Sequence, residues 1–143
     1  MDIVQFKDGY QFLSNMSNVP QGIKHKGITY PSVENFFQAM KTVQIVERKA
    51  ISLLSPKASK AAGRKLKLRT DWHLVRDAVM RYGIKAKFSQ DPFKMLLMET
   101  SDCNISEGNY WGDSYWGYDL KKEYGENKLG NILMDFRAIL KEV

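Results

Sequence analysis

One short stretch of the chain places a carboxylate, an amide and an amine beside an apolar stripe. It reads YPSVENFFQAMK and covers residues 30–41. At about 100° per residue, a helix here collects its apolar side chains within one arc of roughly 100°: Val33, Phe36, Phe37 and Met40. Glu34, Gln38 and Lys41 lie together on the flank of that arc, which suggests the edge of a binding site. The alternative is structural: Ser32 caps the helix, and Glu34 in the first turn complements the helix dipole.

A second stretch, residues 106–127, is unusually rich in aromatic and acidic residues. It reads SEGNYWGDSYWGYDLKKEYGEN and holds four glycines, six Tyr or Trp residues and five carboxylates, without a sustained period. A loop longer than about 15 residues in a compact domain is usually functional or disordered, and disorder disfavours so many aromatic rings. Rings offer flat faces for a base or a sugar, so the loop indicates a functional site. The alternatives are a lid that packs on the core and a protein-interaction loop.

Together, the two stretches fit hydrolysis of a glycosidic bond. That reaction needs one carboxyl group for the leaving group or the attacking water, and another to stabilise positive charge on the sugar. It also needs surroundings that exclude bulk water. We therefore expect Glu34 and the acidic, aromatic loop to converge on one cleft.

The elements that must position these groups are mostly helices. Periodicity predicts helices at 33–42, 45–54, 57–67, 72–87 and 92–100. A last helix presents Leu129, Ile132, Leu133, Phe136 and Leu140 on its core face. Short strands are expected at residues 3–6 and as a tight hairpin around Gly27. The fold class is α+β: a single compact domain over residues 1–143, predominantly helical with a few short N-terminal β-strands.

The composition narrows the class of protein. Cys103 is the only cysteine, so no internal disulfide can form, and with only His25 and His73 beside it no spacing resembles a zinc site. The N-terminus lacks the pattern of a signal peptide, and nowhere do about 18 apolar residues run together. We expect a cytoplasmic protein with no structural metal and no membrane segment.

Positive charge is concentrated in one segment. The formal net charge is +6, and between Glu47 and Asp71 there are eight basic residues and no acidic one. Positive potential attracts phosphate, either on nucleic acid or on a nucleotide-like ligand. The alternative is a set of ordinary solvated lysines on helix faces.

Several motifs occur in the order and spacing of a known family, the YbiA-like or NADAR superfamily. The N-terminal segment resembles the family pattern Phe-Leu-Ser-Asn-Phe at Phe12, Leu13, Ser14, Asn15 and Met16. The first helix resembles Ser-x-Glu-His-x-x-Gln-Ala-x-Lys at Ser32, Glu34, Gln38, Ala39 and Lys41. Further matches lie at Ala62, Gly63, Arg64, Met80, Lys87, Phe88, Asp113, Trp116, Gly117, Gly125, Asn127, Leu129, Gly130, Leu133, Met134 and Arg137. The resemblance covers nearly the whole chain, and the joint order of its motifs is specific.

Two features depart from the family pattern. Asn35 stands where the family usually has His, so any role of that ring is lost or shifted here. The loop contains two Trp-Gly pairs, at Trp111 and Trp116. We align the family's Asp-x-x-Trp-Gly with Asp113 and Trp116 because of their spacing; Asp119 is the alternative carboxylate.

The resemblance implies hydrolysis of N-glycosidic bonds. Family members are similar to enzymes that cleave ribose phosphate from early intermediates of riboflavin biosynthesis, or that remove ADP-ribose from guanine bases in nucleic acid. Both substrates join a ribose C1 to an amine nitrogen of a base and carry phosphate. The implied partners are therefore an ADP-ribose-like or ribose-phosphate substrate and, in the second case, ADP-ribosylated DNA or RNA. No cofactor is implied.

The resemblance also implies roles for individual residues. Glu34 would stabilise charge at ribose C1, attack there or activate water; Asp113 would transfer a proton, and Trp116 would stack on the base or ribose. Lys41 would bind phosphate, lower the pKa of Glu34 or form an imine with the opened ribose; its alternative is a surface lysine. The expected substrate-binding residues are Asn15, Phe37, Gln38, Lys41, Arg64, Glu107, Asn109, Asn127 and Arg137.

Two other functions would use the same residues. One is a non-catalytic module that binds nucleic acid or ADP-ribose through the basic segment and the aromatic rings. The other is a small interaction protein with the aromatic loop as its contact surface. Product formation from an ADP-ribosylated but not a plain oligonucleotide distinguishes the enzyme from the binding module. The interaction protein would have no pocket joining Glu34 to Asp113.

Overall fold

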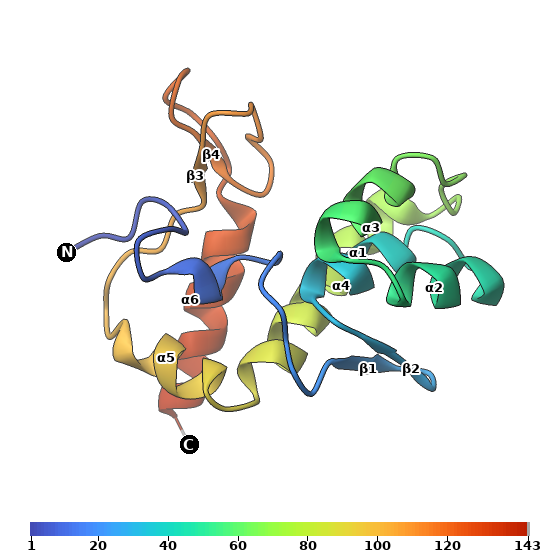
Figure 1. Cartoon of the computed structure of the whole chain (residues 1–143). Helices are drawn as coiled ribbons and strands as arrows, with labels where there is room; N and C mark the ends of the chain where they lie inside the picture. Colours follow the sequence, from blue (N-terminus) through green and yellow to red (C-terminus); the bar gives the residue numbers. More distant parts are fainter. Residues whose placement is uncertain (143) are drawn as a thin grey trace. The chain divides into compact units, whose positions relative to one another are not determined.

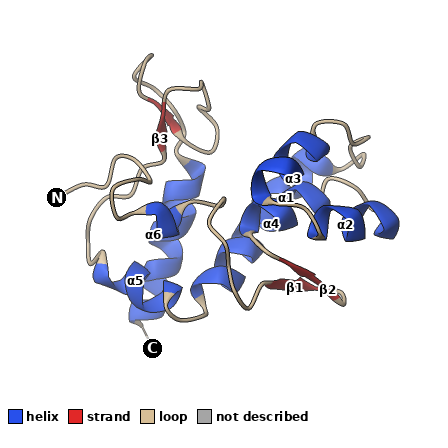
Figure 2. Cartoon of the chain, in the orientation of Figure 1, coloured by secondary structure: helices blue, strands red, loops and turns tan. Residues whose placement is uncertain are grey.

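Helices dominate the fold, as the sequence predicts. The computed structural model describes residues 1–142, and this range contains six α-helices, one 3-10 helix and four short strands (Figures 1 and 2). The chain forms two compact units, one of residues 15–89 and one of residues 1–14 with 90–143. The α+β class is confirmed, although two of the four strands lie late in the chain. No helix within residues 1–142 is long and apolar enough to cross a membrane.

The unit of residues 15–89 begins with the predicted hairpin. β1 (Ile23–His25) pairs antiparallel with β2 (Ile28–Tyr30), with Ile23 opposite Tyr30. Lys26 and Gly27 in the turn have φ values of 47° and 81°. Two successive positive φ angles are typical of a type I′ turn, whose twist matches that of the flanking strands.

The helix α1 (Val33–Ala39) is the centre of this unit. Ser32 caps it, because the Ser32 hydroxyl accepts a hydrogen bond from the N–H of Asn35 at 3.0 Å. Every residue of α1 except Glu34 is buried. Three helices pack on α1: α2 (Ile45–Ser52), α3 (Pro56–Gly63) and α4 (Trp72–Phe88).

Asn35, at the place of the family's His, has a structural role. Its side chain is completely buried and donates to the carbonyls of Ile51 (2.9 Å) and Leu54 (2.8 Å). It also accepts from the Ser32 hydroxyl at 2.6 Å. Asn35 therefore joins the start of α1 to the end of α2.

The other unit is built on two helices and a long loop. α5 (Phe93–Glu99) packs on α6 (Lys128–Lys141) and on the 3-10 helix η1 (Gln11–Leu13). The core face of α6 is the predicted one, with Leu129, Ile132 and Leu133 buried. Between the helices, β3 (Gly108–Asn109) pairs in parallel with β4 (Tyr118–Asp119).

Some predicted boundaries are wrong. The strand predicted at residues 3–6 is absent: Ile3 alone forms an isolated bridge, with Ile105. The helix predicted to reach residue 42 ends at Ala39, and the one predicted to reach residue 67 ends at Gly63. In both places the following N–H groups bond carbonyls three residues back, so each chain continues as a tight turn.

Candidate active site

Glu34 lies in the first turn of α1, at the partly buried edge of the helix. Its backbone N–H donates to the carbonyl of Asn15 at 3.0 Å. Its carboxylate Oε2 accepts a long hydrogen bond, 3.5 Å, from Nε2 of Gln38, one turn further along. Glu34 forms no ion pair with any residue in the described part of the chain.

Three cations surround this carboxylate without pairing with it. Burial raises the pKa of Glu34, and the charge of Lys60, the hydrogen bond from Gln38 and the charges of Lys41 and Arg64 oppose that rise. Burial prevails, so the carboxyl group holds its proton to a higher pH than a solvated glutamate does.

Lys41 is not an ordinary surface lysine. Burial lowers its pKa, Glu34 raises it, and Arg64 and Lys60 lower it further. Its Nζ lies 5.8 Å from the centre of the Phe37 ring, at the outer limit of a cation–π contact. The Phe37 ring packs edge-on against Trp72, with centroids 5.1 Å apart. Lys41 therefore lies at the margin between the apolar core and the Glu34 edge.

A glycine makes room for Gln38. A Cβ added at Gly63 would lie 1.8 Å from Oε1 of Gln38 and 3.2 Å from its Cβ, so no larger residue fits without displacing Gln38. Oε1 of Gln38 is buried and has no hydrogen-bond partner among residues 1–142. The close packing of α3 on α1 at Gly63 thus holds the amide that bonds to Glu34.

Asn15 reaches the same region mainly through its backbone. Its carbonyl accepts from Glu34, while its side-chain Nδ2 donates to the sulfur of Met80 at 3.4 Å. The side-chain Oδ1 is buried without a partner in the described chain. Asn15 therefore carries an unused acceptor close to the start of α1.

The loop of residues 106–127 is organised by Asn109. This side chain is completely buried. Its amide nitrogen donates to the carbonyls of Glu107 (3.3 Å), Asp113 (2.8 Å) and Tyr118 (3.3 Å). Its oxygen accepts from the N–H of Asp113 at 3.0 Å. Asn109 therefore holds the loop closed, which explains how a segment with little regular structure is ordered.

Asp113 folds the turn that presents Trp116. One carboxylate oxygen, Oδ1, accepts from the N–H groups of Tyr115 (3.1 Å) and Trp116 (3.0 Å). The other oxygen has no partner among the described residues. The half-buried Trp116 ring packs edge-on against Tyr115 at 4.8 Å. The family spacing of Asp and Trp is thus one hydrogen-bonded turn.

The alternative pair is placed differently. Asp119 is 3% exposed, and its Oδ1 accepts from the N–H groups of Lys121 (2.9 Å) and Lys122 (3.0 Å). Trp111 is 70% exposed. Asp113 and Trp116 are thus both partly exposed, whereas Asp119 is buried within the loop.

The remaining predicted binding residues make structural contacts. The Asn127 side chain accepts from the N–H of Glu107 (3.0 Å) and donates to the carbonyl of Ile105 (2.9 Å), which fixes the loop to the start of α6. Arg137 is buried, not a solvated edge residue, and donates to Thr100 Oγ1 at 2.8 Å. Their roles in substrate binding stay predictions.

The structure brings together six of the predicted residues within the unit of residues 15–89: Asn15, Glu34, Phe37, Gln38, Lys41 and Arg64. Within the other unit it groups Glu107, Asn109, Asp113, Trp116 and Asn127 on one loop, whereas Arg137 binds elsewhere on α6. The sequence prediction missed Lys60, the cation with the largest effect on the pKa of Glu34. The signal was present, since Lys60, Gly63 and Arg64 lie on one face of a helix.

One lysine that matches the family pattern, Lys87, was given no role by the sequence, and its burial was not predicted. Lys87 is completely buried, and its Nζ donates to the Ser17 hydroxyl at 2.6 Å. Burial lowers the pKa of Lys87 to about 7. Its sequence position in α4 gave no reason to expect a buried amine.

Comparison with known proteins assigns the chain to a family. Residues 4–141 match the NADAR domain family. The N-glycosidase YbiA of Escherichia coli is 36% identical over 137 residues, which cover 93% of this chain and 83% of YbiA. The riboflavin biosynthesis protein VVA0006 of Vibrio vulnificus is 31% identical over 139 residues, covering 94% of this chain and 37% of that protein.

A solved structure agrees with this assignment. The NMR structure of E. coli YbiA superimposes with a TM-score of 0.83 at 32% identity, covering 99% of this chain and 86% of that one. The chain therefore belongs to the NADAR domain family, to which relatives named N-glycosidases also belong.

Proposed function

We propose that the chain is an N-glycosidase that hydrolyses the bond between ribose C1 and an amine nitrogen of a base. The observation that carries this proposal is the environment of Glu34. A carboxylate is held in a partly buried place, with a raised pKa and no ion pair, among Lys41, Lys60 and Arg64. The names of the relatives support the reaction class.

The carboxylate suits the charge that develops in this reaction. When the C1–N bond breaks, its electron pair leaves with the amine nitrogen, which takes up a proton, and water supplies the hydroxyl group that adds to C1. Positive charge develops on the ribose before the water adds. A poorly solvated Glu34 carboxylate would stabilise that charge strongly or accept the proton of the attacking water, because little solvent screens it.

The cations suit a phosphate group on the substrate. Lys60 and Arg64 lie on one face of α3, and Lys41 joins them from the end of α1. None of the three forms an ion pair with Glu34. Binding of a phosphate by these groups would offset their mutual repulsion, so phosphate recognition gives a reason for the cluster.

In the same proposal, Asp113 transfers a proton to the departing nitrogen and Trp116 stacks on the base or the ribose. The unpartnered oxygen of Asp113 and the half-buried ring of Trp116 support these roles. The other predicted binding residues contribute hydrogen bonds to sugar hydroxyls or base edges.

Two substrate classes fit the chemistry. One is a phosphorylated intermediate of riboflavin biosynthesis, which the name of the Vibrio relative supports. The other is ADP-ribosylated guanine in DNA or RNA, which the net charge of +6 favours mildly. In this proposal the enzyme is cytoplasmic and needs no cofactor.

A direct comparison of both substrates tests the proposed function. Purified chain is incubated with the phosphorylated intermediate and with an ADP-ribosylated oligonucleotide, and mass spectrometry detects the freed base and ribose species. We expect release from one class at a rate far above that without protein. Saturable binding to either substrate with no released product would instead identify a non-catalytic binding module.

A further inference from the structure

A pocket lies in the unit of residues 15–89, lined by none of the residues around Glu34. Its volume is about 450 Å3, within the range of small-molecule sites. It is lined from β1 and its turn, α1, the start of α2, and α4. From α1 and its C-cap it uses Phe36 and Met40, which project roughly 150° around the helix axis from the edge that carries Glu34 and Gln38. The groove is therefore separate from the Glu34 cluster.

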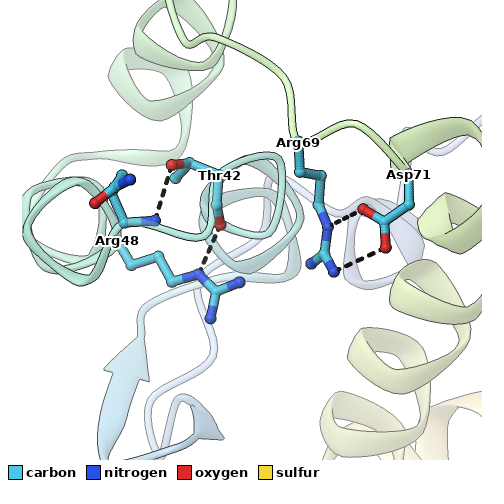
Figure 3. Close-up of polar contacts among 5 residues, drawn as sticks. Thr42, Arg48, Arg69 and Asp71 are labelled. Carbon is cyan, nitrogen blue, oxygen red and sulfur yellow. Dashed lines mark hydrogen bonds and ion pairs between the residues drawn. The ribbon is translucent and has the colours of Figure 1, made fainter.

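Arg48 is the unusual residue of this groove. The side chain is only 7% exposed, yet it forms no ion pair with any residue of the described chain. Its Nε donates to the carbonyl of Thr42 at 2.8 Å (Figure 3), and its two terminal nitrogens donate to no other residue of the described chain. A buried guanidinium without a counter-charge is unfavourable, because the lost solvation is not replaced. The terminal nitrogens thus provide an unused fork of donors.

The other charges around the groove do not neutralise Arg48. Arg69 is already paired with Asp71, at 2.6 and 3.2 Å (Figure 3). Glu47, next to Arg48 in the sequence, accepts a hydrogen bond from the Thr42 hydroxyl. No acidic residue lines the groove, whereas Lys26 adds a further positive charge. The groove therefore complements an anion.

The rest of the groove is apolar and aromatic. The rings of Phe36 and Tyr82 stack with centroids 5.2 Å apart, and His25 packs edge-on against Tyr82 at 5.3 Å. Val43 and Ile45, at the margin, are 58% and 48% exposed. An apolar ligand body would cover these surfaces and remove them from water.

We infer that this groove binds a small organic carboxylate with an aromatic or branched apolar body. The carboxylate pairs with the fork of Arg48, since a guanidinium matches a carboxylate in shape and charge. The body lies against Phe36, Tyr82 and Val79. Neither the N-glycosidase reaction nor the Glu34 cluster requires this site.

His25 provides an internal reporter. Burial, followed by the charges of Arg48 and Lys26, lowers the pKa of His25. A carboxylate bound to Arg48 would offset those charges, so binding should raise the pKa of His25. An uncharged ligand in the same groove would not.

A titration of the full chain with 3-phenylpropionate, monitored by two-dimensional NMR, tests the inference. We expect saturable shifts at the amides of Val43, Ile45 and Val79, and an upward shift of the His25 pKa. The alcohol 3-phenyl-1-propanol has the same body without the charge and should bind about tenfold more weakly or less. Equal binding of the alcohol, or shifts that never saturate, would overturn the inference.

Two variants with a matched control complete the test. Arg48→Gln should weaken binding of 3-phenylpropionate at least about tenfold. Because that change also alters the bond to Thr42, Ala78→Trp serves as a second variant: Ala78 is an exposed lining residue, and a large ring there blocks the groove. Ala138→Trp, at an exposed position of α6, should bind normally. Unchanged binding in both groove variants would contradict the inference.

Discussion

At the scale of single residues, Glu34 combines a structural and a chemical position. It lies in the first turn of α1, where a negative charge suits the helix dipole. It is also partly buried, which raises its pKa despite three nearby cations. A group placed only to complement the dipole would gain by full exposure to water. The burial supports the proposed catalytic role of Glu34, beside its favourable place at the helix N-terminus.

The raised pKa predicts how Glu34 affects stability. A carboxyl whose pKa is higher in the folded state binds its proton more tightly there, so its contribution to stability falls as pH rises from about its unfolded value of 4.5 through the folded one. We expect Glu34→Gln to have an equal or higher Tm than the parent chain at neutral pH. Thermal unfolding of both proteins from pH 4 to 8 measures this. A Tm several degrees lower in the variant at neutral pH would favour the capping role.

The two Trp-Gly pairs of the loop lead to a prediction for four variants, which should lose hydrolysis to different degrees. Asp113→Asn removes the proposed proton donor, and Trp116→Ala removes a stacking face worth about 1 to 3 kcal/mol per base, or roughly 5- to 150-fold in rate. Asp119→Asn and Trp111→Ala should reduce hydrolysis less, since Asp119 is engaged within the loop and Trp111 is exposed. Steady-state kinetics of the four variants measure the losses. Large losses at Asp119 and Trp111, with Asp113 and Trp116 spared, would assign the site to the other pair.

At the scale of elements, the contact between α1 and α3 positions the candidate site. Gly63 lets α3 approach Gln38, and Gln38 bonds to Glu34. Lys60 and Arg64 follow from the same packing because they share that face of α3. The helix α3 thus supplies both the support and the charge around Glu34.

The contact between Gly63 and Gln38 can be tested by a rescue experiment. Gly63→Ala should destabilise the fold by about 1 to 3 kcal/mol through overpacking, and reduce activity because Gln38 is displaced. In a Gln38→Ala background the same change should cost much less, because the clashing side chain is gone. Denaturant unfolding of the two single variants and the double variant gives the coupling energy. Additive effects would mean that Gly63 acts through something other than Gln38.

Local signals explain which elements were predictable. The hairpin followed from Gly27, and α1 from Ser32 and its apolar stripe, because turn and cap preferences act within a few residues. The strand at residues 3–6 failed because its pairing depends on Ile105, far along the chain. Glu34, Gln38 and Lys41 were predictable as one helix edge. Lys60 and the burial of Arg48 depend on packing between helices, which periodicity does not specify.

At the scale of the whole molecule, the two proposed substrate classes differ in how many of the positive charges they would contact. The net charge is +6, and the basic residues between Glu47 and Asp71 include Lys60 and Arg64. A polymer contacts several cations through its phosphates, whereas a free nucleotide contacts few. Only the polymer releases many condensed counterions on binding.

The salt dependence of the hydrolysis rate should therefore distinguish the two substrate classes. For a nucleic-acid substrate, kcat/KM should fall steeply between low and physiological salt. In a plot of log kcat/KM against log salt concentration, the slope should be about −0.7 to −0.9 for each phosphate contact. Replacing Lys60 and Arg64 with Gln should reduce that slope by roughly 1 to 2. Kinetics at several salt concentrations measure the slope. A nearly flat response would favour the free phosphorylated intermediate.

Glu34 is the residue proposed to carry out hydrolysis of the ribose C1–N bond. The most direct test is the rate of base release by Glu34→Gln, measured by mass spectrometry on the substrate that the parent chain cleaves faster. Glu99→Gln, an exposed carboxylate of α5, is the matched control. We predict a loss of about 10³ or more for Glu34→Gln, equivalent to roughly 4 kcal/mol, with the fold and substrate binding retained and Glu99→Gln unaffected. Turnover by Glu34→Gln at the rate of the parent chain would show that Glu34 has no catalytic role.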